Sequence, residues 1–499
     1  MEKNYKKLVL ELSGIGIQLS AEQDVDKLLE IILEESMKIS CSDGGSIYIK
    51  EADNNNRWLR FKVSRNFSRN IDFTEFTLPL DNKSIAGYVG MSGKALKISD
   101  INNIPSEVGI KYNPAFDKKI SYKTINMLVI PLKDYTGDVV GVIQLINKKK
   151  SYNIVLGNED NIIKDIVDYD EEEIEIISSL AAQAGILVER TKLYNEIQEL
   201  LRSFIESMVV TLDSRDITTS GHSRRLAGYA KRFLETVDRV EYGIYKNCKF
   251  GKDEVREIYY AALLHDIGKI GVKESVLQKS GRVSKEAIEA IKYRIKYAYL
   301  LLNKEQKLML NIDSKELIKK IEDINNKGFI NDEEINLVNL CNKIVFCDDG
   351  VENKLLTDFE VENLSVRKGN LTENEREEMN SHVKYSYEIL KGINWTKGLR
   401  NVPEIAGAHH EKIDGTGYPN HISGEKISIQ ARILAIADIF EALTARDRPY
   451  KPPMSVEKAL SILEFEVKDN HLDKELYEIF IKEKIYEMYQ EELNKIIKI

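Results

Sequence analysis

The chain has 499 residues, which is too long for a single hydrophobic core and predicts two or more domains. Its hydrophobic content of 42% and charged content of 31% are typical of a soluble globular protein. The formal net charge of −9 argues against a general nucleic-acid surface, and no basic recognition helix supports a DNA-binding regulator.

The sequence contains no feature of a secreted or membrane-spanning protein. Its first residues lack the uninterrupted apolar stretch and small-residue cleavage site of a signal peptide. No segment reaches the roughly 18–20 apolar residues of a membrane span. The cysteines Cys41, Cys248, Cys341 and Cys347 form no CxxC pair, so reduced thiols are the simpler interpretation. We therefore expect a cytoplasmic protein without a membrane span.

The first half of the chain predicts helices around a sheet. Residues 4–39 have apolar side chains at helical spacing and predict a helix. Strand-like runs follow, beginning at Ser46, Leu59, Met127 and Val139. The turn sequence DYTGD separates the last two runs, so we expect them to form a hairpin.

A long helix is predicted from Asp170 to about Leu212. Its apolar stripe, which includes Ile174, Ile177 and Leu187, continues past Leu193 without a Pro or a Gly-rich linker. Such a helix would join two domains, and we favour its pairing with a second copy in a homodimer. The alternative is a final domain helix that packs only on its own sheet.

From about residue 209 onward the chain is predicted to be mostly helical. Residues 293–363 differ from their surroundings because they are rich in Lys, Asp, Glu, Asn, Leu and Ile. We interpret this stretch as a helical insertion that leaves the functional site intact, with its role left open.

Histidine is distributed very unevenly along the chain. The first two hundred residues contain none, whereas His222, His265, His382, His409 and His410 follow in the second half, accompanied by Asp266 and Asp438. Imidazole and carboxylate groups are the usual ligands of first-row transition metals. Each of these residues alone could be structural, but together they predict a polynuclear metal centre. His421 and His471 fall outside the pattern and are interpreted as structural.

The local sequence supports buried positions for these ligands. The run AALL buries a helix just before His265-Asp266, and Asp438 interrupts the apolar helix ARILAIADIFEAL. A lone buried aspartate would be costly without a partner, and a metal is a sufficient partner. Lys269 follows Asp266 by about one helical turn, where it could meet a substrate phosphate.

Together, the motifs ALLHDIGKIGV, HHEKIDGTGYPNHISGEKI and ARILAIADIFEALTARDRPYK resemble the HD-GYP family of metal-dependent phosphohydrolases. The resemblance implies an all-helical domain that holds two or three metals, commonly iron or manganese, and hydrolyses cyclic di-GMP. It implies as metal ligands His222, His265, Asp266, His382, His409, His410 and Asp438. It implies catalytic roles for Asp266 and Lys269. It implies a substrate pocket formed by Lys269, Asp414, Gly415, Gly417, Tyr418, Arg448 and Lys451.

The chain departs from the family at one position that bears on the metals. Some members place a Glu four residues before the first histidine, where it helps to hold a third metal, and here that position is Thr218. We therefore expect two divalent metals and disfavour a third. Two metals can activate water and bind phosphate oxygens, which would open cyclic di-GMP to pGpG and then, in some members, to GMP.

The first half resembles a GAF domain, a sensor with an antiparallel sheet and flanking helices. The resemblance rests on SIAGYV from Ser84 and on the run from Phe116 to the second predicted strand of the hairpin. Asn147-Lys148 and Asp170-Glu171 fit the pattern of nucleotide-binding members, but Ile166 replaces its Phe. A small-molecule or cyclic-nucleotide ligand is one interpretation. A domain that dimerises or senses something else is preferred, and its ligand is unknown.

The predicted architecture is thus multidomain, with an α+β GAF domain over residues 1–198 and an all-α HD-GYP domain over residues 199–499, joined by a long helix. We expect a cyclic di-GMP phosphodiesterase regulated by the GAF domain. The alternatives are a phosphohydrolase of another cyclic dinucleotide, such as cyclic GMP-AMP, or a catalytically weak receptor or scaffold.

Overall fold

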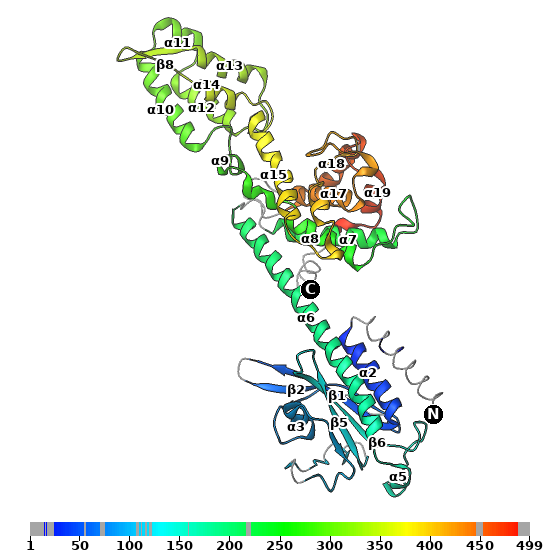
Figure 1. Ribbon diagram of the computed structural model, residues 1–499. Helices are drawn as coiled ribbons and strands as arrows, with labels where there is room; N and C mark the ends of the chain where they lie inside the picture. The colour runs from blue at the N-terminus through cyan, green and yellow to red at the C-terminus, as the bar shows by residue number, and fades with distance from the viewer. Residues whose placement is uncertain are drawn as a thin grey trace. The chain divides into compact units, whose positions relative to one another are not determined.

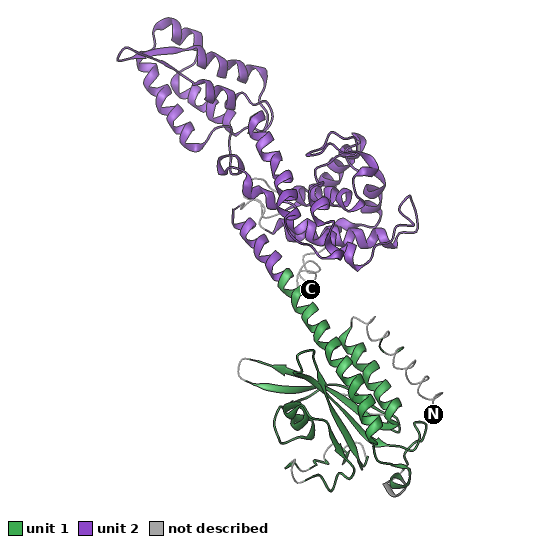
Figure 2. Cartoon of the chain, viewed as in Figure 1, with its two compact units in different colours: residues 1–201 green, residues 202–499 purple. Residues whose placement is uncertain are grey.

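The computed structural model describes Gly14, Gly16 and residues 24–487, apart from 54–55, 70–74, 106–108, 111, 115–116, 119–121, 158, 216–220 and 446–452. The chain divides into two compact units, residues 1–201 and 202–499 (Figure 2). Among the described residues, no helix is both long and apolar enough to cross a membrane.

An antiparallel sheet of six strands forms the centre of the first unit, in the order β3-β2-β1-β6-β5-β4 (Figure 1). The strands are β1 (Ser42–Ala52), β2 (Arg57–Asn66), β3 (Thr77–Pro79), β4 (Leu96–Ile98), β5 (Met127–Lys133) and β6 (Val139–Lys148). The four predicted strands are the four longest, and the predicted β5–β6 hairpin is confirmed. The two edge strands were not predicted, because three residues are too few to show an alternating pattern.

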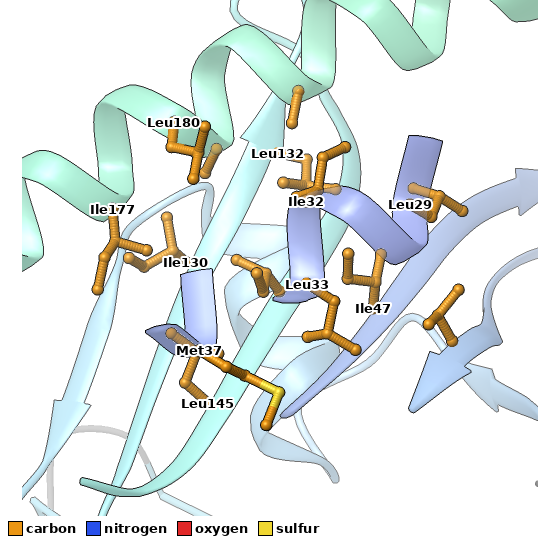
Figure 3. Close-up of a cluster of buried hydrophobic side chains, with 14 of the residues drawn as sticks. Leu29, Ile32, Leu33, Met37, Ile47, Ile130, Leu132, Leu145, Ile177 and Leu180 are labelled. Atoms are coloured by element: carbon orange, nitrogen blue, oxygen red, sulfur yellow. The ribbon is translucent and has the colours of Figure 1, made fainter. Parts of the chain in front are cut away.

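Helices cover both faces of this sheet. Figure 3 shows one face, where Ile130 and Leu145 of the sheet pack with side chains of α2 (Val25–Ser40) and α6 (Glu171–Arg215). On the other face, α3 (Ile85–Ser92) contributes Val89 to a second cluster. Neighbouring strand residues point to opposite faces, so one sheet serves two hydrophobic cores. The short helix α5 (Glu159–Asp165) follows β6.

The predicted long helix is confirmed as α6, which has 45 residues without interruption. Asp170 precedes it and accepts a hydrogen bond from the Glu173 amide at 2.8 Å, which satisfies a free donor of the first turn. Ile177 and Ala184 are fully buried in the first unit. Part of α6 therefore belongs to the core of the GAF-like unit, and its last turns belong to the second unit.

The second unit is mostly helical, as predicted. Its helices outside the insertion are α7 (His222–Arg239), α8 (Lys252–Leu264), α9 (Glu274–Leu277), α15 (Glu373–Lys391), α16 (Val402–Ala406), α17 (Ile429–Thr444), α18 (Val456–Lys468) and α19 (Lys474–Lys482). Short 3-10 helices lie between them, at η3 (Ile267–Gly271), η4 (Lys397–Leu399), η5 (Gly424–Lys426) and η6 (Ile485–Glu487).

The insertion has its own hydrophobic core, built from residues between Val283 and Leu364. It comprises α10 (Lys285–Leu301), α11 (Lys304–Leu310), α12 (Ser314–Asn326), α13 (Asp332–Lys343), β7 (Val345–Asp348), β8 (Val351–Lys354) and α14 (Asp358–Leu364). The predicted helical insertion is mostly helical but also contains two strands, because β7 and β8 form an antiparallel hairpin. Its turn, Asp349-Gly350, has positive φ angles of 48° and 82°, and Asp-Gly is a recognised signal for such two-residue turns.

Candidate metal centre

The predicted ligands come from segments far apart in the sequence and meet in the second unit. His222 begins α7, His265-Asp266 lies between α8 and η3, His382 lies on α15, His409-His410 follows α16, and Asp438 lies on α17. Their donor atoms form three groups, each with all atoms within 4.8 Å of one another. The groups are His222 with His265 and Asp266, His265 with His409 and Asp438, and His382 with His409 and His410.

Asp266 lies between two sets of histidines. Its Oδ2 is 3.2 Å from His265 Nε2, and its Oδ1 is 3.2 Å from His382 Nε2. Burial opposes ionisation of this carboxyl, but His265 and Lys269 hold its pKa well below the ordinary value. An ionised carboxylate with its two oxygens directed to different histidines could help to hold a metal on either side.

Three of the histidines are oriented by backbone carbonyls one turn earlier. The Nδ1 atoms of His265, His382 and His409 lie 2.8, 2.6 and 2.6 Å from the carbonyl oxygens of Ala262, Met379 and Ala406. Each contact fixes Nδ1 as the protonated nitrogen and leaves Nε2 with its lone pair.

Among the described residues, the Nε2 atoms of His382 and His409 are buried without a hydrogen-bond partner, and the nearest polar contact of the first is the Asp266 carboxylate at 3.2 Å. A buried polar atom left unpaired costs free energy, so an orphaned lone pair in a donor cluster fits a metal ligand. Burial, reinforced by the neighbouring His410 and His265, holds the pKa of His409 well below its ordinary value. Burial likewise lowers the pKa of His410 to about 4. Neutral imidazole is the form that binds metals, so His409 and His410 fit the predicted centre.

His222 is oriented by a carboxylate that the sequence analysis missed. Glu441 on α17 is 2% exposed and contacts His222 Nδ1 and, at 2.5 Å, Arg225 Nε. His222 Nε2 lies 3.1 Å from Asp438 Oδ1. Burial lowers the pKa of His222, but the hydrogen bonds to Asp438 and Glu441 outweigh it and raise the pKa to about 10. The available signal was a second carboxylate one turn after Asp438 on an apolar helix.

The loop that carries Asp266 and Lys269 is packed tightly against α15. The Gly268 amide donates to Ser386 Oγ at 2.8 Å, and this hydroxyl donates to the His265 carbonyl at 2.6 Å. A Cβ at Gly268 would lie 1.9 Å from the His382 carbonyl oxygen, so only glycine allows this approach. Ser386 and Gly268 therefore fix the distance between the Asp266 loop and His382. Lys269 Nζ lies 2.9 Å from Asp266 Oδ2.

The loop with Gly417 and Tyr418 lies against the same centre. The Tyr418 ring centroid is 4.9 Å from that of His410, and the Tyr418 amide donates to the His410 carbonyl at 3.2 Å. A Cβ at Gly417 would lie 2.3 Å from the Lys412 nitrogen, so the loop closes only with glycine there. The buried Glu411 carboxylate accepts the amides of Asn420 and Ile422 at 2.7 and 3.1 Å.

The other predicted substrate residues are less directly placed. Asp414 accepts the Thr416 amide at 2.9 Å, and Gly415 has a positive φ of 84°, so both shape the turn. Thr218, Arg448 and Lys451 lie outside the described residues. His471, interpreted as structural, lies 2.6 Å from Glu466 through its Nδ1 and belongs to none of the three donor groups among the described residues.

The GAF-like unit contains a cavity of about 480 Å³. Its lining includes aromatic rings and small polar side chains, among them Tyr48, Phe61, Tyr112, Ser46, Ser64 and Gln144. The residues of the nucleotide-binding pattern make contacts away from this cavity. Asn147 is buried and bonds the Ile125 amide and the Lys123 carbonyl at 2.7 and 2.8 Å, and Lys148 lies 3.5 Å from Asp170. None of these residues lines the cavity.

The fold and donor set define a helical domain with a histidine–aspartate cluster that could hold metals, which follows an α+β domain. A GAF domain model matches residues 24–188, and two HD domain models match residues 219–342 and 359–476. The chain therefore contains a GAF domain followed by HD-domain sequence, as its motifs predicted.

Relatives with known descriptions match parts of the chain. The 3'3'-cGAMP-specific phosphodiesterase 3 of Vibrio cholerae is 46% identical over 96 residues, 19% of this chain and 20% of that protein. A cyclic di-GMP phosphodiesterase of Thermotoga maritima is 23% identical over 310 residues, 61% of this chain and 56% of that protein. The chain thus spans less than two thirds of either relative. The GAF domain structure of an Acinetobacter phosphoenolpyruvate-protein phosphotransferase is 16% identical, with a TM-score of 0.27, over 38% of this chain and 95% of that one.

Proposed function

We propose that the second unit is a metal-dependent phosphodiesterase that opens cyclic di-GMP to pGpG. The observation that carries this proposal is the position of Asp266, whose two oxygens face two histidine sets while Lys269 lies beside it. Phosphodiesters are anionic, so a site that hydrolyses them needs positive charge and an activated water. The phosphodiesterases of Vibrio cholerae and Thermotoga maritima that match the chain support the same reaction class.

Two divalent metals would be held by His222, His265, Asp266, His382, His409, His410 and Asp438. Iron or manganese suits this mixture of imidazole and carboxylate donors. When bound, such metals supply Lewis acidity toward a phosphate and lower the pKa of a water. A third metal is disfavoured because Thr218 offers no carboxylate. The backbone carbonyls beside His265, His382 and His409 keep the donor nitrogens directed inward.

The residues around the metals would bind and orient the substrate. Lys269 carries the positive charge that offsets charge developing on the phosphoryl oxygens. The Tyr418 ring, tilted against that of His410, and the tight turn at Gly417 would form one wall of the substrate site. Asp414 and Gly415 hold the shape of this loop, and Arg448 and Lys451 would add positive charge.

The alternative substrate with a specific observation behind it is 3'3'-cyclic GMP-AMP, the molecule named for the Vibrio cholerae relative that is 46% identical. Anaerobically purified, metal-analysed protein should be incubated with cyclic di-GMP, 3'3'-cyclic GMP-AMP and cyclic di-AMP, and the products separated by chromatography. We expect fastest conversion of cyclic di-GMP to pGpG. Faster conversion of cyclic GMP-AMP would reassign the substrate. Tight binding without turnover would support a receptor or scaffold.

A matched pair of histidine variants tests whether the cluster is responsible. His409→Ala removes a buried donor, whereas His421→Ala removes a histidine outside the donor groups. We expect His409→Ala to lose both metal and hydrolysis and His421→Ala to retain its metal. Equal metal content in the two variants would contradict the assignment.

The GAF domain would regulate this reaction by binding a small molecule and acting through α6. Apolar residues remain exposed along this helix, namely Ile186, Leu193, Ile197, Leu200 and Phe204. Their spacing of 7, 4, 3 and 4 residues follows a heptad pattern and supports a homodimer through α6. Sedimentation of Leu200→Glu, with the exposed Lys192→Glu as control, should show loss of the dimer in the first variant only.

A further inference from the structure

The last turn of α6 contacts two segments that carry predicted metal ligands. One follows Asp266, and the other is the start of α7 at His222. Arg215 donates through Nη1 to the Ile270 carbonyl and through Nη2 to the Val272 carbonyl, the latter at 2.7 Å. Two residues earlier, Asp213 Oδ2 accepts the Gly221 amide at 3.2 Å. Ile270 follows Lys269, and Gly221 immediately precedes His222.

The geometry of a helix explains how two nearby residues reach two segments. Residues two positions apart on a helix project about 200° from each other. The side chains of Asp213 and Arg215 therefore project to opposite sides of the α6 axis. The planar guanidinium of Arg215 presents a rigid set of donors, so it can hold two carbonyls at once, which a single ammonium group does less well.

Further contacts fix this arrangement. Arg215 Nε lies 3.4 Å from Glu274 Oε2 on α9, and Arg224 Nη1 lies 3.4 Å from Asp213 Oδ2. The segment that Arg215 holds is also tied from its other side, where Gly268 donates to Ser386 of α15. The loop with Asp266 and Lys269 thus has two attachments, one to the helix of His382 and one to α6.

We propose that Asp213 and Arg215 form an α6 clamp that positions the Asp266–Lys269 loop and the start of α7 for catalysis. Both residues act through the segments that they hold, so we class them as positioning residues. The proposal rests on the phosphodiesterase function proposed above and deepens it, because it names the residues through which α6 would alter turnover. Rotation or withdrawal of the last turn of α6 would release the carbonyls of Ile270 and Val272 and let Lys269 move relative to Asp266.

The test compares Arg215→Ala, Arg215→Lys and the control Arg239→Ala in the full-length protein. Arg239, which is exposed, is likewise an arginine in the last turn of a helix of the second unit, at the end of α7. Amide hydrogen exchange of residues 267–273 is measured first, since it does not depend on activity. We expect exchange to rise about tenfold or more in Arg215→Ala, partial recovery in Arg215→Lys, and no change in Arg239→Ala.

Kinetics and metal content give the second measurement. In Arg215→Ala we expect kcat for cyclic di-GMP to fall about 10- to 100-fold, because small displacements of catalytic groups have effects of this size. The KM and the bound metal should stay near the unsubstituted values, and Arg215→Lys should recover part of kcat. Loss of metal would instead indicate a general collapse of the site and overturn the proposal.

The two proposals fail in different ways. Unchanged exchange of residues 267–273 in Arg215→Ala would overturn the clamp, whatever the substrate. Raised exchange in a protein that hydrolyses no cyclic dinucleotide would support the clamp as a structural connection and overturn the proposed function.

Discussion

The histidine–aspartate cluster of the second unit and the cavity of the first unit differ in how their residues are held. In the metal centre, His265, His382 and His409 each have one ring nitrogen fixed by a carbonyl one turn earlier. The cavity of the GAF domain is lined by rings and small polar groups such as Tyr48, Ser64 and Gln144. The first site is specified by a few imidazole and carboxylate side chains, and the second by its shape.

This difference affects what each site can reveal about its ligand. A cluster of imidazoles and carboxylates selects metals by the chemistry of its donors. A cavity with mixed polar and aromatic lining accepts many small molecules. The ligand class of the metal centre therefore follows from its residues, whereas that of the GAF cavity needs a binding screen.

The largest expected effect concerns Asp266. Asp266→Asn keeps the size of the side chain but removes the charge that faces both histidine sets. Several kcal/mol of transition-state stabilisation would be lost, which is about a thousandfold or more in kcat. Initial rates of cyclic di-GMP hydrolysis measure this. Asp469→Asn, at the exposed end of α18, is the control. Equal rates in both variants would contradict the catalytic role of Asp266.

A smaller effect is expected at Glu441. Glu441→Gln removes the charge that orients His222 and pairs with Arg225. Loss of such an orienting group lowers metal affinity by about 10- to 100-fold. Metal titration against a chelator measures it, with the exposed Glu457→Gln as control. Unchanged affinity would show that His222 is held in place without Glu441.

The smallest effect on the metal centre is expected from filling the GAF cavity. Ser46→Phe places a ring in the cavity at a buried strand position, whereas Thr136→Phe changes the exposed turn between β5 and β6. If cyclic GMP or cyclic AMP binds this cavity, it raises the unfolding temperature of the unsubstituted protein and of Thr136→Phe but not of Ser46→Phe. Metal content should be the same in all three. A shift retained in Ser46→Phe would place the nucleotide elsewhere.

The two sites also differ in how much the sequence could predict. The cluster of candidate donors was predictable because histidine and buried aspartate are rare and chemically specific, and the structure brings these side chains together. Glu441 was missed because a glutamate on a helix is ordinarily exposed to solvent. Only its burial beside His222 shows that it orients this histidine.

In the first unit the four longest strands were predictable as strand-like runs of apolar residues, whereas the cavity was not. Its lining comes from residues between Gly45 and Ile146, and no spacing rule connects them. Asn147 and Lys148 matched a nucleotide-binding pattern, yet they contact Ile125, Lys123 and Asp170 instead of the cavity. Sequence patterns identify specific donor atoms better than they identify enclosed space.

The most direct test of the account is the number of metals bound per chain. Anaerobically purified protein should be analysed for iron and manganese by mass spectrometry, together with His409→Ala. The account predicts about two metals per chain in the unsubstituted protein and a clear loss in the variant. No bound metal in active protein, or the same metal content after substitution of His409, would contradict it.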